Sequence, residues 1–400
     1  MAASRPLEGV RVIELGQLLA GPFAGSLLAY FGAELIKVEP PEGGDPIRGW
    51  RVVDDDGTSF WWRSLARNKK CISIDLKQEQ GRVLVRQLLD SADVLIENFR
   101  PGVMEGWQLG PDDLKETNPR LIYTRISGYG QTGPNAGKPG FASVCEGFSG
   151  FRYTNGFKNE APVRPNLSIC DTIAGLHAAF GITMALLERT KSANGTGQVI
   201  DVALFEAMFN LLEAVVPEYS GAGVIREPSG TTVTGIVPTN TYRSRDGKFI
   251  IIGGNGDSIF KRLMSAIGRE DLAADPRLAS NSGRVEHEAE IDAVLAAWCA
   301  GQDAKNILEL LEEQRVPAGP IYSVADMFKD PHFHARELFE RVEINGKPLD
   351  LPAAMPKLSA TPGRTDWPGP DLGSHTQEVL VDILGLDADA IAELTASKVI

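Results

Sequence analysis

The chain has 400 residues, of which 43% are hydrophobic, 23% charged and 7% aromatic. This composition is typical of a globular protein large enough for two domains, and it excludes the disordered, collagen-like and coiled-coil classes. The 40 Lys and Arg against 53 Asp and Glu give a formal charge of −13, and no long basic run occurs. We therefore expect neither nucleic acid nor an anionic membrane as a partner, although a local basic cluster can still bind a small anion.

The four cysteines, Cys71, Cys145, Cys170 and Cys299, lie far apart and form no CxxC pair. This spacing predicts neither a disulfide framework nor a zinc site. The five histidines also form no metal-binding pattern, so we predict no metal. The amino-terminal segment lacks the apolar core of a signal peptide, and no stretch long enough to span a membrane follows. We therefore expect a cytoplasmic protein.

The first part of the chain alternates short β-branched runs with segments of helical spacing. This alternation predicts an α/β fold with a doubly wound parallel sheet. Ligands of such sheets bind beyond the carboxyl ends of the strands, which places Glu39, Lys77, the corner at 98–100 and Ser127 at the rim. The expected strands are 10–15, 34–38, 71–76, 93–99 and 121–127.

The later segments predict a second, smaller unit. An apolar stretch at 171–189 predicts a buried helix that begins at Asp171. A strand and another apolar helix follow up to about Val216, and 217–240 is expected to be a long loop. A hairpin with Asp246-Gly247 at its turn then precedes helices near 257–267, 286–300 and 304–314. We expect a large α/β domain at 1–220, a small α+β domain at 225–330, and a return to the large domain at 331–400, with a last helix near 374–384.

The face of the 171–189 helix that we expect to be buried carries large apolar side chains at helical spacing. Its members are Ile173, Leu176, Phe180, Met184 and Leu187.

Residues 128–133 read GYGQTG, which matches the glycine pattern of dinucleotide-binding sites. Such a site needs a helix to begin at the third glycine, whereas Pro134 and Pro139 follow in a glycine-rich run that cannot start one. A nicotinamide oxidoreductase is therefore a minor alternative. The segment is more typical of a loop that wraps a ligand or a partner chain.

One acidic residue and one cluster of basic residues are candidates for a functional site. Asp171 at a helix start is most often an N-cap, but a carboxylate that stays ionised there while partly desolvated also suits a nucleophile. Arg67, Lys69, Lys70 and Lys77 gather positive charge beside the third strand. Such a cluster is usually a solvated face, yet at the rim of a parallel sheet it is also what a nucleotide with several phosphates requires.

The order of the motifs resembles the class III coenzyme A transferases, the CaiB/BaiF family of formyl-CoA transferase and carnitine CoA-transferase. The motifs are GVRVIELGQLLAGPFAGSLLAYFGAELIKVEPP, ARNKKCISIDL, DVLIENFRPG, NPRLIYTRISGYGQTGP and SICDTIAGLHAAFG, and LGSHTQEVL at 372–380 extends the resemblance over essentially the whole chain. The resemblance implies a large domain built from both chain ends, a smaller domain, and a homodimer of two interlocked chains.

Through this resemblance, Asp171 matches the catalytic aspartate of the family. The residues that match CoA-contacting segments are Asn98, Phe99, Arg100, Asp75, Leu76 and Lys77, with Lys69 nearby. The implied mechanism passes through a mixed anhydride and an aspartyl-CoA thioester. CoA is then a substrate, and no tightly bound cofactor is implied. Water must be excluded from both intermediates, and the loops at 128–134 and 220–235 are candidate lids.

The segments around Asp171 look most like family members that move CoA between succinate and another dicarboxylate, such as malate, citramalate, itaconate, mesaconate or glutarate. The distal carboxylate of such an acid needs a cation. The candidates are Arg48, Arg152 and Arg164.

Two further alternatives are weighed within the superfamily. An acyl-CoA racemase resembles this chain, but its proton-abstracting His-Asp pair is replaced here by Phe141-Ala142. A catalytically silent CoA-binding subunit is the other alternative, and the presence of Asp171 argues against it.

Overall fold

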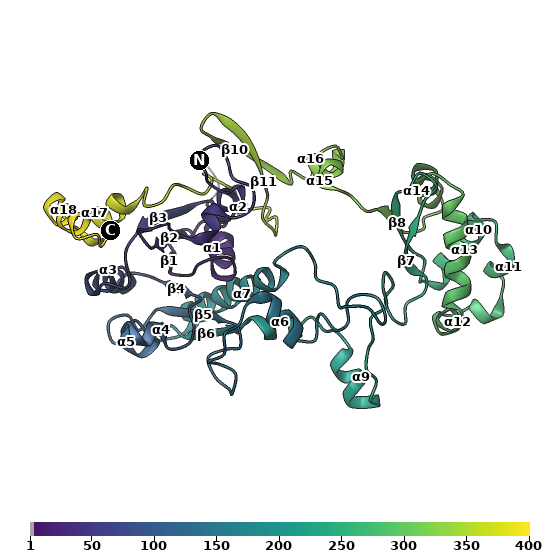
Figure 1. Cartoon of the computed structure of the whole chain (residues 1–400), viewed down its shortest axis with the longest axis horizontal. Coiled ribbons are helices and arrows are strands. Elements are labelled where there is room, and N and C mark those ends of the chain that lie inside the picture. Colours follow the sequence, from purple (N-terminus) through teal and green to yellow (C-terminus); the bar gives the residue numbers. More distant parts are fainter. Residues whose placement is uncertain (1–3) are drawn as a thin grey trace. The chain divides into compact units, whose positions relative to one another are not determined.

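The computed structural model describes residues 4–400, which divide into two compact units (Figure 1). Of the described residues, the first unit contains 4–151, 165–213 and 335–400, and the second contains 152–164 and 214–334. These boundaries differ from the predicted ones mainly at 152–164, which lies in the second unit although the sequence placed it in the large domain.

A six-stranded sheet with the order β3-β2-β1-β4-β5-β6 forms the centre of the first unit. Every neighbouring pair is parallel, which confirms the predicted doubly wound α/β fold. The order reverses between β1 and β4, and this switch point is where ligands bind in such sheets. The strands are β1 (Arg11–Glu14), β2 (Glu34–Glu39), β3 (Lys69–Ser73), β4 (Val94–Glu97), β5 (Ile122–Ser127) and β6 (Val199–Ala203).

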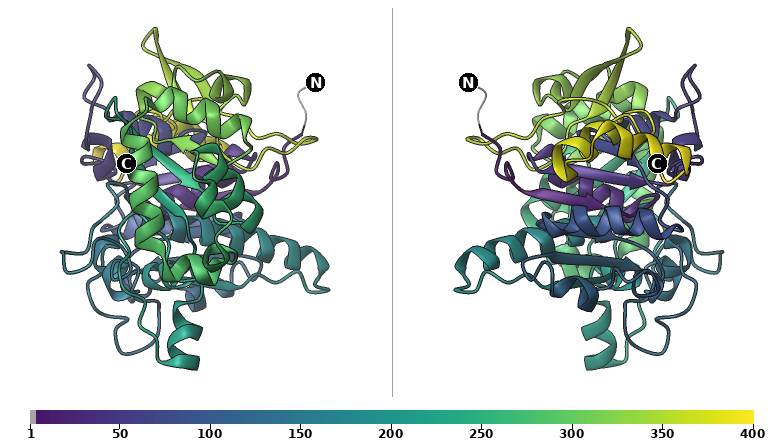
Figure 2. Two further views of the ribbon diagram at one scale, coloured as in Figure 1. Left: turned by 90° about the vertical axis from the view of Figure 1, so that its right-hand side faces the viewer. Right: turned by 90° about the vertical axis from the view of Figure 1, so that its left-hand side faces the viewer.

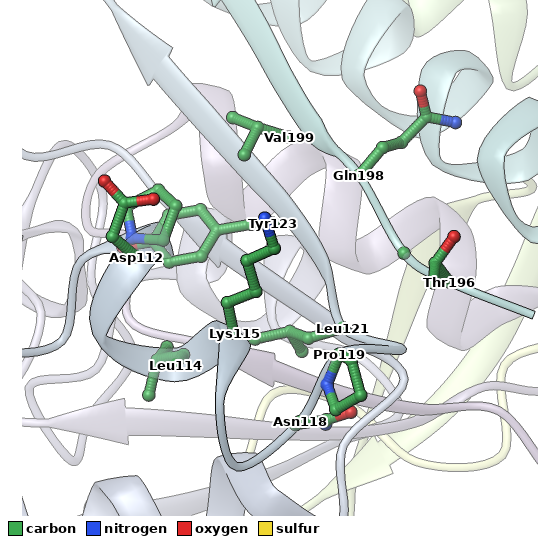
Figure 3. A pocket seen from close by; sticks show the side chains of 12 residues that line it. Asp112, Leu114, Lys115, Asn118, Pro119, Leu121, Tyr123, Thr196, Gln198 and Val199 are labelled. Carbon is green, nitrogen blue, oxygen red and sulfur yellow. The ribbon is translucent and has the colours of Figure 1, made fainter.

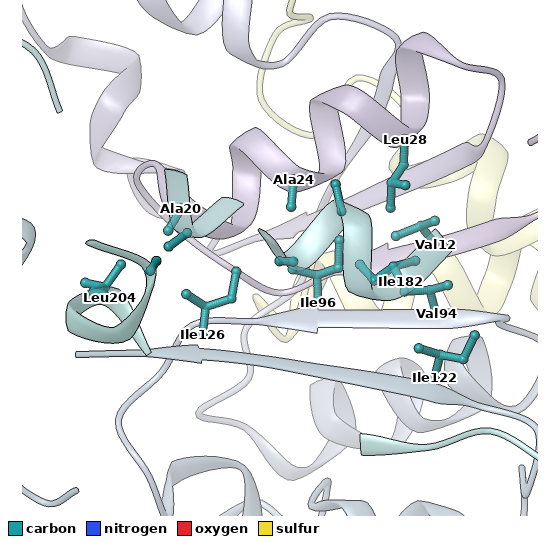
Figure 4. Packing of buried hydrophobic residues seen from close by; sticks show 14 of the residues in the cluster. Val12, Ala20, Ala24, Leu28, Val94, Ile96, Ile122, Ile126, Ile182 and Leu204 are labelled. Atoms are coloured by element: carbon teal, nitrogen blue, oxygen red, sulfur yellow. The ribbon is translucent and has the colours of Figure 1, made fainter. Parts of the chain in front are cut away.

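Helices cover both faces of this sheet, because the buried strands present apolar side chains to each side in alternation. Val12, Val94, Ile96 and Ile122 pack against helices on one face, together with Ile182 (Figure 4). The helices on this face are α1 (Ala20–Tyr30), α6 (Ala142–Phe148), α7 (Ile169–Lys191) and α8 (Leu204–Phe209). The helices on the other face are α3 (Glu79–Asp90), α4 (Val103–Gly106), α5 (Pro111–Lys115), α17 (Thr376–Leu384) and α18 (Ala388–Ala396).

Helix α7 turns the opposite face to the core from the one that the sequence predicts. Of the five residues predicted to be buried, Leu176, Phe180, Met184 and Leu187 are between 50% and 61% exposed, whereas Ile173 is partly buried and packs against the core. The buried residues of the helix are mostly small, together with Ile182. The reason is a close contact with α1, since a Cβ atom on Gly175 would lie 2.6 Å from the carbonyl oxygen of Ala20. By length and hydropathy α7 could cross a membrane, but its packing against α1 and the sheet is typical of a core helix.

The carboxyl-terminal segment closes the edge of the sheet at β3. The Cys71 N–H donates to Nδ1 of His375 at 3.3 Å, the His375 N–H donates to the Cys71 carbonyl at 3.0 Å, and the Ser73 N–H donates to Oγ1 of Thr376 at 2.9 Å. These bonds occupy backbone groups that an edge strand otherwise exposes. Figure 2 shows α17 and α18 in yellow beside the purple amino-terminal strands. The predicted last helix is present as α17, and α18 was not predicted.

The first unit also contains short elements outside the sheet. They are η1 (Pro46–Gly49), α2 (Phe60–Leu65) and the antiparallel hairpin of β10 (Phe339–Ile344) and β11 (Lys347–Pro352).

The second unit is a three-stranded antiparallel sheet with helices packed on one side. The predicted hairpin is present as β7 (Thr239–Arg243) and β8 (Phe249–Gly253), and β9 (Ala318–Pro320) pairs with β8. The predicted loop at 217–240 is wrong in its first part, because α9 (Val215–Ala222) extends to Gly223, whose φ of 67° ends the helix.

The helices that follow β8 are α10 (Asp257–Ala266), α11 (Glu270–Ala273), η2 (Pro276–Leu278), α12 (Asn281–Glu286), α13 (Glu288–Ala300), α14 (Ala304–Glu313), α15 (Val324–Met327) and α16 (Pro331–Ala335).

The contact between α1 and α7 predicts a specific loss of stability. In Gly175→Ala the new methyl group meets backbone atoms of α1, and overpacking of this kind costs roughly 1–3 kcal/mol. The roughly 1 kcal/mol that Ala gains over Gly in a helix offsets part of this cost, so we expect a net destabilisation. The midpoint of urea unfolding, followed by circular dichroism, measures the change. Gly181→Ala is the control, because its methyl meets only the side chain of Ile200, at 3.3 Å. A Gly175→Ala midpoint at or above that of the wild type contradicts the close packing.

Candidate active site

Two loops meet at the switch point of the sheet, at the carboxyl ends of β1 and β4. The side chain of Asn98 joins them, because its Oδ1 accepts the Gln17 N–H at 2.8 Å and its Nδ2 donates to the Gln17 carbonyl at 2.7 Å. Gly16 allows this contact, since a Cβ atom there would lie 3.1 Å from Oδ1 of Asn98. The predicted corner at 98–100 therefore lies at the rim, with Asn98 engaged in holding the neighbouring loop and Arg100 exposed.

A buried network of charged side chains contacts the loop after β1. Nζ of Lys37 lies 3.0 Å from Oε1 of Glu14 and 2.9 Å from Oδ2 of Asp45, and Nζ of Lys69 lies 2.8 Å from Oε2 of Glu14. All four side chains are fully buried. Asp45 also accepts the N–H of Leu18, a residue with a φ of 63°, so the network fixes the strained loop after β1.

Lys69 is buried in the protein, although the sequence predicts that it contacts CoA. Its ammonium donates to both oxygens of Glu14 and to the Pro22 carbonyl, and it has no exposed surface with which to reach a phosphate. Burial lowers the pKa of Lys69, and Glu14 offsets this only in part. Burial also opposes the charge of Lys37, but Asp45 and Glu14 outweigh it and raise the pKa of Lys37.

Arg48 makes its polar contacts within the protein, which argues against its predicted contact with a substrate carboxylate. Its Nε and Nη2 donate to the two oxygens of Glu39 at 2.8 and 2.7 Å, and its Nη1 donates to the Pro370 carbonyl at 3.0 Å. The guanidinium lies over the ring of Trp62, 3.7 Å from the centroid. These bonds engage all three guanidinium nitrogens, and 12% of the Arg48 side chain is exposed.

Asp171 lies in the first turn of α7, where the helix dipole favours a negative charge. It is the third residue of the helix and not its N-cap, which is Ser168, so the N-cap interpretation is wrong. Burial raises the pKa of the Cys145 thiol of α6 to about 11, and the negative charge of the nearby Asp171 carboxylate contributes to this rise. The Cys145 thiol also donates to the Gly128 carbonyl at 3.3 Å, directly after β5.

Asp171 therefore lies at the same end of the sheet as the corner. It is partly buried in a region shared by β5, α6 and α7.

The second predicted CoA-contacting segment follows β3, at the same end of the sheet. Asp75 is held at the chain end, because its N–H donates to the Val399 carbonyl at 2.8 Å, and its Oδ1 accepts the Lys77 N–H at 3.0 Å. Leu76 is half-buried and Lys77 is exposed. Three strand spacings separate β3 from β4, so this segment is roughly 14 Å from the corner across the sheet.

Arg152 and Arg164 belong to the second unit, whereas Asp171 belongs to the first. The roles of these two arginines at the acceptor carboxylate stay predictions.

A cavity of about 430 Å³ lies at the opposite end of the sheet (Figure 3). Lys115, Tyr123 and Val199 are among its lining residues, which come from α5 and from the starts of β5 and β6. Ligands of doubly wound sheets bind at the carboxyl ends, so this position does not support an active site. A second cavity, of about 630 Å³ and mainly apolar lining, lies beside the first turns of α7 and includes Ser168 and Leu176.

Sequence reasoning missed the buried network, although the sequence contains a signal for it. Glu14 and Lys37 interrupt β-branched runs that otherwise read as buried strands. Charged side chains are rarely buried unless they are paired, so an acid and a base in two neighbouring buried strands indicate an ion pair.

The chain matches the model of CoA-transferase family III over residues 7–376. It is 46% identical over 99% of its length to succinyl-CoA–D-citramalate CoA-transferase of Chloroflexus aurantiacus, of which it covers 98%. It is 42% identical, also over 99% of its length, to the alpha subunit of succinyl-CoA–L-malate CoA-transferase of the same species, of which it covers 92%. A crystal structure of a CaiB/BaiF family protein from Brucella suis superimposes with a TM-score of 0.84 at 34% identity, covering 95% of this chain and 100% of that one. The chain therefore belongs to family III of the CoA-transferases.

Proposed function

We propose that the protein transfers CoA from succinyl-CoA to a short dicarboxylic acid of the citramalate or malate type, with Asp171 as the nucleophile. The observation that carries this proposal is the 46% identity, over nearly the whole of both chains, to an enzyme named for succinyl-CoA and D-citramalate. The position of Asp171 at the ligand-binding end of the sheet supports its role.

The proposed reaction needs no general base. A carboxylate oxygen of Asp171 attacks the succinyl carbonyl carbon, the C–S bond breaks, and the CoA thiolate leaves behind a mixed anhydride. The thiolate then attacks the aspartyl carbonyl, which releases succinate and forms the aspartyl-CoA thioester. The acceptor carboxylate attacks the carbonyl carbon of this thioester, the C–S bond breaks, and a second mixed anhydride forms between Asp171 and the acceptor. The CoA thiolate then attacks the acceptor carbonyl of this anhydride, which gives the new CoA ester and frees the Asp171 carboxylate.

Exposed basic residues at the rim are proposed to receive the phosphates of CoA. Arg100 at the corner and Lys77 after β3 are both exposed, unlike Lys69. A charge-assisted contact with a phosphate suits such side chains. Arg152 and Arg164 are the candidates that remain for the distal carboxylate of the acceptor, and the loops at 128–134 and 220–235 are the proposed lids.

Racemase chemistry is disfavoured, because Phe141 and Ala142 offer no group that accepts a proton.

A second copy of the chain is proposed to cover the exposed side of α7, as a homodimer. Leu176, Phe180, Met184 and Leu187 form a continuous apolar stripe there, each at least 50% exposed. Exposed apolar patches of this kind mark interaction sites. Leu176 also lines the apolar cavity beside α7, so the stripe is continuous with a hollow surface. The proposed location is the cytoplasm, which is consistent with four buried cysteine thiols.

Replacement of Asp171 tests the chemistry. Asp171→Asn keeps the shape of the side chain but removes the nucleophile, so we expect transfer to fall by roughly a thousandfold or more. The assay incubates the protein with succinyl-CoA and each of malate, citramalate, itaconate, mesaconate and glutarate, and detects new CoA esters by mass spectrometry. Asp112→Asn is the control, because Asp112 is an exposed aspartate in the first turn of α5 at the other end of the sheet.

Two results would contradict the proposal. Wild-type protein that forms no new ester with any of these acids would overturn the substrate class, and an Asp171→Asn protein that keeps wild-type activity would overturn the nucleophile.

A charge in the α7 stripe tests the homodimer. We expect Phe180→Asp to convert the protein to monomers, because a carboxylate buried in an apolar interface without a partner is costly. Sedimentation velocity gives the mass of each species. Val83→Asp is the control, since Val83 is also 50% exposed but lies on α3, at the other face of the sheet. A Phe180→Asp protein that sediments as a dimer would refute this assignment.

A further inference from the structure

Glu97 is the last residue of β4 and directly precedes the corner at 98–100. Its side chain is buried, with 1% of the residue exposed. One carboxylate oxygen accepts from Nε of Arg125 on β5 at 2.7 Å, and the other accepts the N–H of Phe99 at 2.8 Å. A single carboxylate thus connects a neighbouring strand to the backbone of the corner.

The bond to the Phe99 N–H determines which way the corner backbone faces. The peptide between Asn98 and Phe99 is planar, so its C=O points away from its N–H. With the N–H held by Glu97, the Asn98 carbonyl points away from that carboxylate, and within residues 4–400 it accepts no hydrogen bond. The ring of Phe99 packs edge-on against Trp107 at 5.1 Å, and the Asn98 side chain holds Gln17. The bond from the Phe99 N–H to Glu97 therefore fixes the direction of the Asn98 carbonyl.

The charges around Glu97 do not balance. Arg125 also contacts Glu105 of α4, with Nη1 to Oε1 at 2.6 Å and Nη2 to Oε2 at 3.2 Å, so two carboxylates share one guanidinium. Tyr123 of β5 faces the same cluster, and its hydroxyl donates to the Leu109 carbonyl at 2.9 Å. Burial raises the pKa of Glu97 to about 7, against the opposing effects of Arg125 and the Phe99 N–H and with a further rise from Glu105.

The direction of this shift sets the pH dependence. Below about pH 7 the Glu97 carboxyl takes up a proton, and it then has one acceptor oxygen fewer for its two donors. Above this pH both oxygens accept. Because the pKa is higher in the folded protein than in the unfolded chain, ionisation of Glu97 lowers the stability of the fold as the pH rises to about 7, while it strengthens the hold on the Phe99 N–H.

We infer that Glu97 is a positioning residue for CoA binding, whose ionised carboxylate holds the Phe99 N–H and so fixes the backbone of the corner that receives CoA. This inference rests on the proposed function, in which the corner at 98–100 lies against CoA. Glu97 itself acts through Phe99 and does not contact the reacting atoms.

Glu97→Gln tests the inference. The amide has one oxygen, so it serves either Arg125 or the Phe99 N–H and turns its NH₂ group toward the other donor. At about pH 8 we expect the Kd for CoA to rise roughly tenfold, with kcat changed less than about twofold. As the pH falls from about 8 to about 6, the wild-type Kd should rise with a midpoint near 7, whereas the Glu97→Gln value should stay constant.

Isothermal titration calorimetry with CoA gives each Kd, and steady-state rates with succinyl-CoA separate KM from kcat. Glu34→Gln is the control, because Glu34 also accepts from an arginine Nε, that of Arg11 at 2.8 Å, but lies at the amino end of β2. Its Kd for CoA should equal that of the wild type.

Each outcome decides a different point. A wild-type protein that does not bind CoA overturns the proposed function together with this inference. A wild type that binds CoA while Glu97→Gln shows the same Kd and the same pH dependence overturns the inference alone. If Glu97→Gln does not fold, Glu105→Gln provides the test. Without the Glu105 carboxylate, the midpoint of the pH dependence of the Kd for CoA should lie at lower pH than in the wild type. A midpoint equal to that of the wild type overturns the inference.

Discussion

The geometry of this protein depends on the buried ion pairs that the Glu14 carboxylate makes with two lysines. This carboxylate lies between the ammonium groups of Lys37 and Lys69, and Lys37 in turn contacts Asp45. Two positive and two negative charges are thus buried together, which is tolerable only because each has a partner. Removing any one would leave an uncompensated charge in the interior, at a cost of roughly 3–5 kcal/mol. The helix above is shaped around this group, since a Cβ atom on Gly25 would lie 2.0 Å from Oε2 of Glu14.

The consequences of this network extend to the rim by successive contacts. Asp45 holds the Leu18 N–H, Lys37 donates to the Gly16 carbonyl, and both bonds fix the loop that contains Gln17. Gln17 in turn is bound by both polar atoms of the Asn98 side chain. A set of charges with no exposure to solvent therefore sets the position of the two loops at the switch point of the sheet.

Features set by neighbouring residues could be predicted from the sequence, whereas contacts between distant residues could not. The strands and the position of the corner at 98–100 follow from residues near in sequence, because β-branched runs act locally. The partners of Lys69 and Arg48 are Glu14 of β1 and Glu39 of β2, and a cluster of basic residues in the sequence does not reveal such distant partners. The face of α7 was misassigned because periodicity favours the larger apolar residues, whereas close packing against α1 selects small ones.

The bonds from His375 and Thr376 to β3 also constrain the order in which the molecule assembles. Strand β3 is made early in synthesis, but the segment that covers its edge is separated from it by some 300 residues, including the whole of the second unit. Most of the second unit, in contrast, is one continuous stretch at 214–334. Contacts so distant in the chain form slowly, because a long loop must close first. On the ribosome, the continuous stretch can therefore complete its own core before the older sheet acquires its last covering segment.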